Sequence, residues 1–247
     1  MKAPRRVAAL IAALCVGAGA RASEPIRVGG FAPGLGEWRL AAPATRAAPP
    51  ARARKWEGVA AAELVSRAEM VMLARPLAID LAATPVLCWR WRIDAPLRSA
   101  DWSVRAGDDF AARVYVGFHS PEASLGVVLR ARLRLARALW GEELPDAALN
   151  YVWDNRQPVG ARRPNATTAR AQMIVAESGG GRAGRWVEER ADVAADAGAL
   201  LGKNLRTALL AIASDTDDTG ESALAGFADL HFVPRGARCE FPALAAR

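Results

Sequence analysis

Residues 85–94 read PVLCWRWRID, and the bulky side chains of this stretch fall on every second position. Trp89, Trp91 and Ile93 alternate with small or charged residues, which is the period that sends neighbouring side chains to opposite faces of a strand. Residues 107–118, GDDFAARVYVGF, show the same alternation after two acidic residues. Both stretches predict strands of a sheet that buries one face.

The rest of the chain continues this pattern, with one exception. Residues 125–140 carry apolar side chains at spacings of three and four, which predicts an amphipathic helix. We expect this helix to shelter a face of the domain, although a basic helix of this kind also suits a membrane surface. Further strand signals, separated by turns that contain Gly or Pro, lie at residues 62–67, 70–74, 77–81, 148–153, 171–177, 185–193, 206–213 and 224–233.

About nine or ten strands, one helix and no alternation of strands with helices predict the fold class. We expect an all-β protein, an antiparallel β-sandwich or jelly roll with one amphipathic helix. Residues 57–247 are expected to form it as a single domain. Residues 23–56, rich in Pro, Gly, Ala and Arg, predict an extended arm that adds one or two short strands and forms a loop at residues 43–55.

The first 22 residues have the layout of a secretory signal peptide. Basic residues precede an apolar run over residues 7–18, and small residues suited to cleavage follow. The apolar run is shorter than the ~20 residues that span a membrane. We therefore expect a periplasmic or secreted protein with no transmembrane span after signal removal.

The net charge and the cysteine content bear on the partners of the protein and on its disulfide bonding. The formal net charge is +7, but Lys2, Arg5, Arg6 and Arg21 carry four of these charges, which leaves about +3 after cleavage. A balance this small, with acids and bases mixed, argues against nucleic acid as a partner. Cys88 and Cys239 remain; the sequence leaves open whether they form a disulfide or Cys88 is a small buried side chain.

Five segments occur in an order and spacing typical of one protein family. They are the 85–93 strand, the GDD stretch at 107–118, LNYVW at 149–153, WVEERADV at 186–193 and SDTDDTG at 214–220. Together they resemble domain of unknown function family 3047, a group of secreted bacterial proteins, over about residues 56–233. The resemblance implies one exported domain and no particular activity.

A compact acidic cluster gives the candidate metal site. Asp215, Asp217 and Asp218 follow an apolar strand, and loop carboxylates with backbone carbonyls are ligands that calcium prefers. The alternative is a turn in which these side chains cap their own backbone. Calcium is the one possible cofactor that the sequence indicates.

The candidate ligand-binding residues are charged or aromatic and lie near predicted strand ends. Such side chains hydrogen-bond the hydroxyl groups of sugars or stack on sugar rings, although paired charges and buried aromatic residues are the ordinary alternatives. The set is Asp108, Asp109, Arg113, Tyr151, Trp153 and Arg190.

Three functions are therefore open. The leading hypothesis is a non-enzymatic, exported β-sandwich that binds a carbohydrate or another polar envelope ligand. The second is a glycan hydrolase or lyase, with Asp108 or Asp109 and Asp215 or Asp217 as acid and base. The third is a structural or assembly partner in the cell envelope. No catalytic triad or nucleophile motif is visible, so the sequence favours binding over catalysis.

Overall fold

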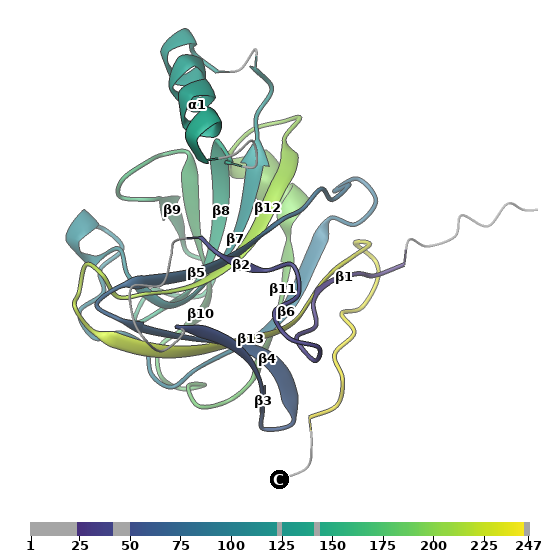
Figure 1. Cartoon of the computed structure of the whole chain (residues 1–247), viewed down its shortest axis with the longest axis vertical. Helices are drawn as coiled ribbons and strands as arrows, with labels where there is room; N and C mark the ends of the chain where they lie inside the picture. The colour runs from purple at the N-terminus through teal and green to yellow at the C-terminus, as the bar shows by residue number, and fades with distance from the viewer. Residues whose placement is uncertain (1–23, 42–49, 123–124, 141–143, 245–247) are drawn as a thin grey trace, which may run out of the picture.

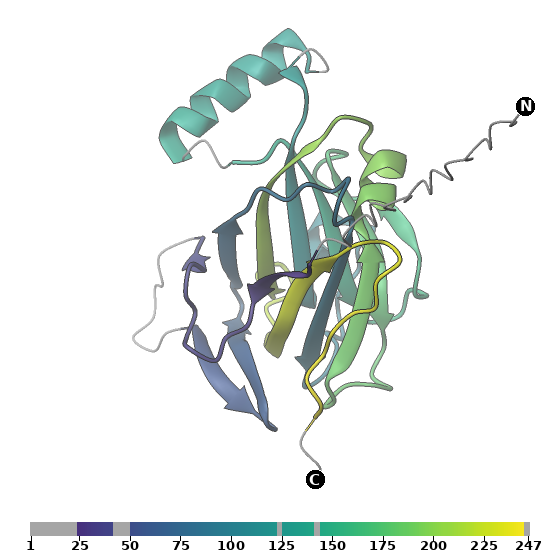
Figure 2. The ribbon, with the colours of Figure 1, turned by 90° about the vertical axis from the view of Figure 1, so that its right-hand side faces the viewer.

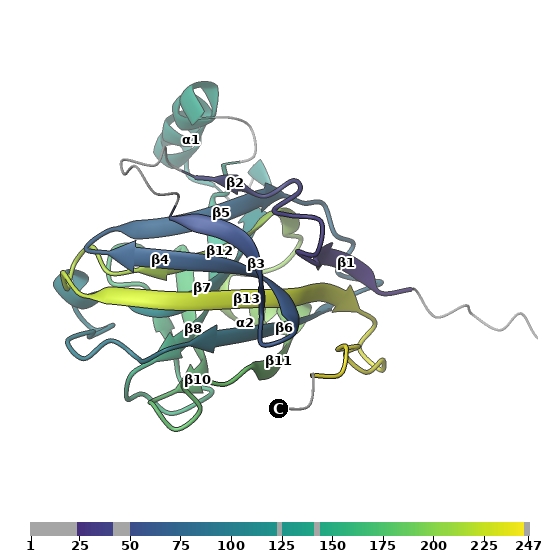
Figure 3. The same ribbon diagram turned by 60° about the horizontal axis from the view of Figure 1, so that its bottom comes forward.

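The computed structural model describes residues 24–41, 50–122, 125–140 and 144–244. Two sheets lie face to face, so the protein is a β-sandwich, as predicted (Figures 1 and 3). The expected signal peptide, residues 1–22, lies outside the described residues. No helix in the described part of the chain is long and apolar enough to cross a membrane.

Sheet A is antiparallel throughout, and its longest strand is β13. In spatial order it contains β11 (Val187–Asp192), β6 (Val86–Ile93), β13 (Ser222–Val233), β4 (Val59–Arg67) and β3 (Ala51–Trp56), with β1 (Ile26–Gly29) also paired to β13.

Sheet B is mixed, because β8 and β10 run parallel while its other neighbouring strands are antiparallel. In spatial order it contains β2 (Arg39–Leu40), β5 (Met70–Pro76), β12 (Arg206–Asp215), β7 (Phe110–His119), β8 (Ala147–Asp154), β10 (Ala171–Ser178) and β9 (Arg162–Pro164).

The alternating pattern of residues 85–94 has the consequence that the sequence predicts. On β6, Trp89 and Trp91 are fully buried between the sheets, and their ring centroids lie 5.5 Å apart. Across the core, Tyr151 packs 5.5 Å from Trp89, and Trp153 packs 5.6 Å from Trp91. Aromatic pairs at these separations add to the stability that burial of their area provides.

Several local predictions need correction. Residues 51–55, placed in the expected loop of the arm, belong to β3, which pairs fully with β4. Residues 77–81 are not a strand, because Pro76 ends β5 and the next contacts are single hydrogen bonds to residues 207 and 208. The described residues contain thirteen strands rather than nine or ten, because β9 was not expected and the arm contributes β1, β2 and β3 where one or two short strands were expected.

A second helix, α2 (Val193–Leu200), was not predicted. Its first turn is capped by Asp192, whose side chain accepts a hydrogen bond of 3.0 Å from the Ala195 N–H. Val193 and Ala197 are buried in the main core, and the helix packs against β6 of one sheet and β8 of the other. The apolar run that continues β11 therefore belongs to a helix that bridges the two sheets.

The predicted amphipathic helix is present as α1 (Val127–Trp140), but it does not shelter a face of the sandwich. It projects from the end of sheet B at which β7 ends and β8 begins (Figures 1 and 2). Val127 and Val128 are 78% and 67% exposed, and Leu135 is 65% exposed. Helical periodicity alone did not distinguish a covering helix from a projecting one.

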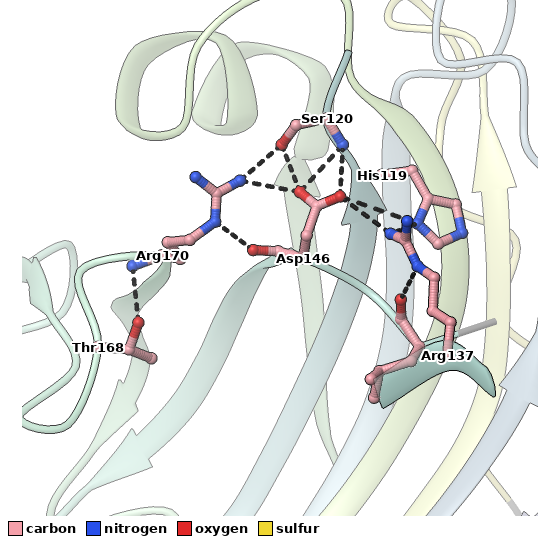
Figure 4. A network of polar contacts seen from close by, with 7 residues as sticks. His119, Ser120, Arg137, Asp146, Thr168 and Arg170 are labelled. Carbon is pink, nitrogen blue, oxygen red and sulfur yellow. Dashed lines mark hydrogen bonds and ion pairs between the residues drawn. The ribbon is translucent and has the colours of Figure 1, made fainter. Parts of the chain in front are cut away.

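A polar network fastens the end of α1 to the sandwich (Figure 4). Asp146, just before β8, pairs with Arg137 of α1 at 3.1 Å and with Arg170 at 2.8 Å, and it accepts hydrogen bonds from Ser120. Arg137 also donates to Nδ1 of His119 at 2.8 Å. The Ser120 hydroxyl donates its hydrogen bond to Asp146, not to His119, and Nδ1 of His119 accepts a hydrogen bond from Arg137. These residues therefore do not form a Ser-His-Asp relay.

The chain after β13 returns over the outer face of sheet A. Cys239 forms a disulfide with Cys88 of β6, with Cα atoms 5.8 Å apart, which settles the pairing that the sequence left open. Phe241 packs edge-on against His231, and the Arg90 guanidinium lies 4.9 Å from its ring centroid. The C-terminal segment thus covers one part of this face and leaves another part open.

Candidate functional site

The predicted acidic residues come together at one end of sheet B. Asp108 and Asp109 directly precede β7, and Asp215 ends the neighbouring strand β12, where it is paired in register with Phe110. One carboxylate oxygen each of Asp109, Asp215 and Asp217 lies within 4.8 Å of the others. The strand pairing therefore unites two segments that are about a hundred residues apart in sequence.

Arg113 is the basic partner of this cluster. Its guanidinium lies 3.1 Å from Oδ2 of Asp215 and 3.6 Å from Oδ1 of Asp108, and it also donates to the backbone carbonyl of Asp108. The hydroxyl of Tyr115 is 3.2 Å away. Arg113 therefore pairs with Asp108 and Asp215 within a buried group of several charges.

Burial controls the chemistry of this cluster. Asp109 is fully buried, and Asp215 is 5% exposed. Removal from water, together with the charges of Asp217 and Asp109, raises the pKa of Asp215 to about 7, although Arg113 acts in the opposite direction. Asp218 is exposed on the adjoining loop and does not belong to the three-carboxylate group.

Three of the predicted ligand-binding residues are not in this cluster. Tyr151 and Trp153 are each 1% exposed and belong to the core, so they offer no stacking platform for a sugar. The Tyr151 hydroxyl donates to Asp196 of α2 at 2.9 Å, which explains a polar aromatic residue in this position. Arg190 is exposed on β11, at the opposite sheet, and donates to the carbonyl of Arg235.

An open groove of about 600 Å³, which sequence reasoning missed, lies on the outer face of sheet A. Residues of β3 and β4 that alternate with core positions form its floor, and the loop at residues 94–98 and the start of β13 form its rim. Its lining residues include four arginines and three acids, which are Arg52, Arg54, Arg67, Arg98, Glu63, Asp94 and Glu221.

Two of the acids in the groove are already engaged by the protein. The side chain of Glu63 is 2% exposed. Its Oε1 atom forms an ion pair with Arg52 at 2.7 Å, and its Oε2 atom forms one with Arg54. The carboxylate of Glu221 accepts the backbone N–H groups of Arg98 and Ser99 at 3.1 and 2.8 Å. Partial burial raises the pKa of Glu221, but these hydrogen bonds outweigh that effect, so the pKa lies below its ordinary value.

Two aromatic residues support the neighbouring part of this face. Trp56 and Trp186 pack edge to face over Gly226, where a Cβ atom would lie 2.9 to 3.0 Å from their rings. The guanidinium groups of Arg54 and Arg92 lie 5.1 and 4.5 Å from the Trp56 ring centroid. Stacking of this kind holds planar guanidinium groups in place.

A second pair of carboxyl groups, also missed by sequence reasoning, involves β10 and β11. Glu189 accepts a hydrogen bond of 3.2 Å from the indole N–H of Trp91, and Glu177 is paired with Arg182 at 2.7 Å. Burial raises the pKa of Glu189 to about 7, and the charge of Glu177 adds to this effect, against the Trp91 hydrogen bond and Arg182.

We expect Glu189→Gln to stabilise the protein at pH 8 and to leave its stability unchanged at pH 4. The Glu189 carboxyl group has a pKa near 4.5 in the unfolded chain and near 7 in the folded protein. Between these pH values the unfolded chain has lost this proton while the folded protein still holds it, so the wild type loses stability as pH rises. The expected gain at pH 8 is about 1–2 kcal/mol. Urea unfolding of both proteins across this range measures it; a gain that does not depend on pH would contradict the assignment.

Comparison with known proteins identifies a family whose function is unknown. The model of a family described as "Protein of unknown function (DUF3047)" matches residues 45–231. No curated protein matches the chain. Among solved structures, the chain is similar to the family 30 carbohydrate-binding module of the cellulase Cel9D-Cel44B of Clostridium thermocellum, with 8% identity and a TM-score of 0.36, covering 87% of this chain and 95% of that one.

Another solved family 30 carbohydrate-binding module gives 10% identity and a TM-score of 0.35, covering 90% of this chain and 89% of that one. Likeness at this level transfers no ligand to the chain. The case for a function therefore depends on the chain's own groove and charges.

Proposed function

The chain belongs to the DUF3047 family of proteins of unknown function, and we propose that it is an exported, non-enzymatic module that binds an acidic carbohydrate chain in the groove on sheet A. The observation that carries this proposal is the groove itself. It is open, it lies on an exposed sheet face, and it is lined by four arginines. Its volume of about 600 Å³ is within the range of small-ligand sites.

The groove has a net charge of about +1, from four arginines against Glu63, Asp94 and Glu221, and this favours an acidic ligand. The carboxylate of Glu63 is neutralised by Arg52 and Arg54, and that of Glu221 is held by backbone N–H groups. The side chains of Arg67 and Arg98 are exposed at the rim. Guanidinium groups bind carboxylates through two parallel hydrogen bonds, so sugars that carry carboxylates fit this lining better than neutral sugars.

The disulfide and the N-terminal sequence support the part of the proposal that concerns export. A disulfide between Cys88 and Cys239 persists in oxidising compartments such as the bacterial periplasm. Residues 1–22 have the pattern of a signal peptide. Both observations favour a periplasmic or secreted protein, where polysaccharides with carboxylate groups are accessible.

Catalysis at the acidic cluster has less support. A general acid or base must lie within hydrogen-bond reach of the substrate. Asp109 and Asp215 are buried, so a glycan in solution does not reach either carboxyl group in this structure. The exposed apolar residues of α1 suit an assembly partner, but nothing in the structure shows what would cover them.

A charge-reversal variant tests the binding proposal. We expect polygalacturonate and alginate to retard the wild-type protein in affinity gel electrophoresis, while dextran and laminarin do not. The double variant Arg67→Glu/Arg98→Glu should bind the acidic polymers at least tenfold more weakly, because it places two repelling charges at the rim. Both side chains are exposed, so we expect the fold to persist, which circular dichroism checks.

Arg190→Glu provides the matched control, because Arg190 is also exposed on sheet A but lies on the edge strand opposite β3. It changes the net charge by two units, half of the change in the double variant, without touching the groove, and we expect its affinity to stay within about twofold of the wild type. An equal loss of affinity in Arg190→Glu would show that binding depends on net charge rather than on the groove. Absence of retardation by every polymer, or full binding by the double variant, would remove the proposal.

A further inference from the structure

The strongest unassigned feature outside the groove is the group of carboxylates formed by Asp109, Asp215 and Asp217. Two of its members are buried, and each uses one oxygen within the protein. Oδ2 of Asp109 accepts the Thr219 N–H at 2.7 Å, and Oδ2 of Asp215 pairs with Arg113 at 3.1 Å. The other oxygen of each carboxylate, Oδ1, is buried and has no hydrogen-bond partner.

Two orphaned carboxylate oxygens in one cluster are costly. A buried polar atom without a partner costs free energy, and the cost is larger when the group is charged. Arg113 already contacts Asp108 and Asp215, so its single charge does not balance three neighbouring aspartates. The cluster therefore lacks a cation that its unpartnered carboxylate oxygens could coordinate.

We propose that Asp109, Asp215 and Asp217 bind a calcium ion. Calcium binds oxygen atoms at 2.3–2.6 Å, so two oxygens on one ion lie at most about 5 Å apart. The three carboxylates provide one oxygen each within 4.8 Å of one another. Asp217 is exposed, which gives the ion a path from solvent, and backbone carbonyls and water complete its coordination in such loop sites.

The ligand chemistry selects calcium over other metals. All three donors are carboxylates, which are hard ligands, whereas zinc and copper sites rely mainly on nitrogen or sulfur from His and Cys. Magnesium requires near-octahedral geometry and loses its water reluctantly, which disfavours a site whose donors are mostly buried. A bound ion would also join β7, β12 and the loop after β12, because these elements supply the three ligands.

The site differs from the one that the sequence predicts in one ligand. Asp109, from the start of β7, takes the place of Asp218, which follows Asp217 but is not part of the three-carboxylate group. This exchange supplies a matched pair of variants, because Asp217 and Asp218 are adjacent, exposed and identical in type.

Calcium titration of the purified protein after treatment with EDTA tests the proposal. We expect isothermal titration calorimetry to show one site, and calcium at about a hundredfold excess over its Kd to raise the Tm by about 5 °C or more. Asp217→Ala should weaken binding at least tenfold. Asp218→Ala should change the Kd by less than about threefold, because it removes a nearby charge and no ligand.

Two results would overturn the proposal. One is the absence of both heat and a Tm shift with 5 mM calcium in the wild type. The other is calcium binding that Asp217→Ala and Asp215→Asn leave unchanged, which would place the ion elsewhere. Asp215→Asn also shows whether the fold tolerates a neutral side chain at this position, since circular dichroism in the absence of calcium reports it independently of binding.

Discussion

Replacing Trp153 with alanine is expected to destabilise the protein by about 3–5 kcal/mol, as cavity-forming substitutions of large aromatic core residues do. Trp153 is 1% exposed, its ring centroid lies 5.6 Å from that of Trp91, and its indole N–H donates to the carbonyl of Gly179 at 2.9 Å. The substitution would remove the packing and the hydrogen bond together. Urea unfolding followed by circular dichroism measures the change.

Trp186→Ala serves as the comparison for this prediction. Trp186 is only half-buried and lies on the outer face of sheet A against Trp56, so we expect it to cost less than half as much. If Trp153→Ala left the unfolding midpoint unchanged and weakened binding to a polysaccharide, Trp153 would be a ligand platform and its placement in the core would be wrong.

Loss of the Cys88–Cys239 disulfide has the second-largest expected effect. The bond joins residues separated by 151 positions, and a cross-link over so long a loop restricts the unfolded chain strongly. We expect Cys88→Ala/Cys239→Ala to lose about 2–5 kcal/mol, again by urea unfolding. The C-terminal segment that carries Phe241 should also become susceptible to proteolysis.

A reducing agent supplies the control for the disulfide. Wild-type protein unfolded in the presence of a strong reductant should approach the stability of the double variant, while the variant itself should not respond. Equal stability of oxidised wild type and variant would show that the bond contributes nothing, and that Val86, Val233 and Phe241 hold the segment by packing alone.

The main features of the fold could be predicted because they depend on local patterns. Alternation at residues 85–94 places Trp89 and Trp91 in the core, and the same alternation defines β7, β8 and β12. The parallel pairing of β8 with β10 and the position of α1 depend on packing between distant segments, which periodicity does not encode. The two-residue strand β2 is too short to show a pattern.

The candidate site was predictable only in part, for a related reason. Asp108, Asp109, Arg113 and Asp215 are charged residues at strand ends, and strand pairing brings them together. In residues 149–153 apolar side chains occupy both faces of the strand, so the pattern leaves open whether Tyr151 and Trp153 are core residues or a ligand platform, and the structure places both in the core. The groove on sheet A combines residues of β3 and β4 with the loop at residues 94–98 and the start of β13, and none of these segments forms a motif.

Binding of an acidic oligosaccharide in the groove is tested most directly by a chemical-shift titration of isotope-labelled protein with trigalacturonate. We expect the largest changes in the groove, at Arg67, Arg98, Glu221 and Ser222. Changes centred on Asp217 or on α1, or no changes with several millimolar trigalacturonate, would contradict the assignment of this face of sheet A as the ligand site.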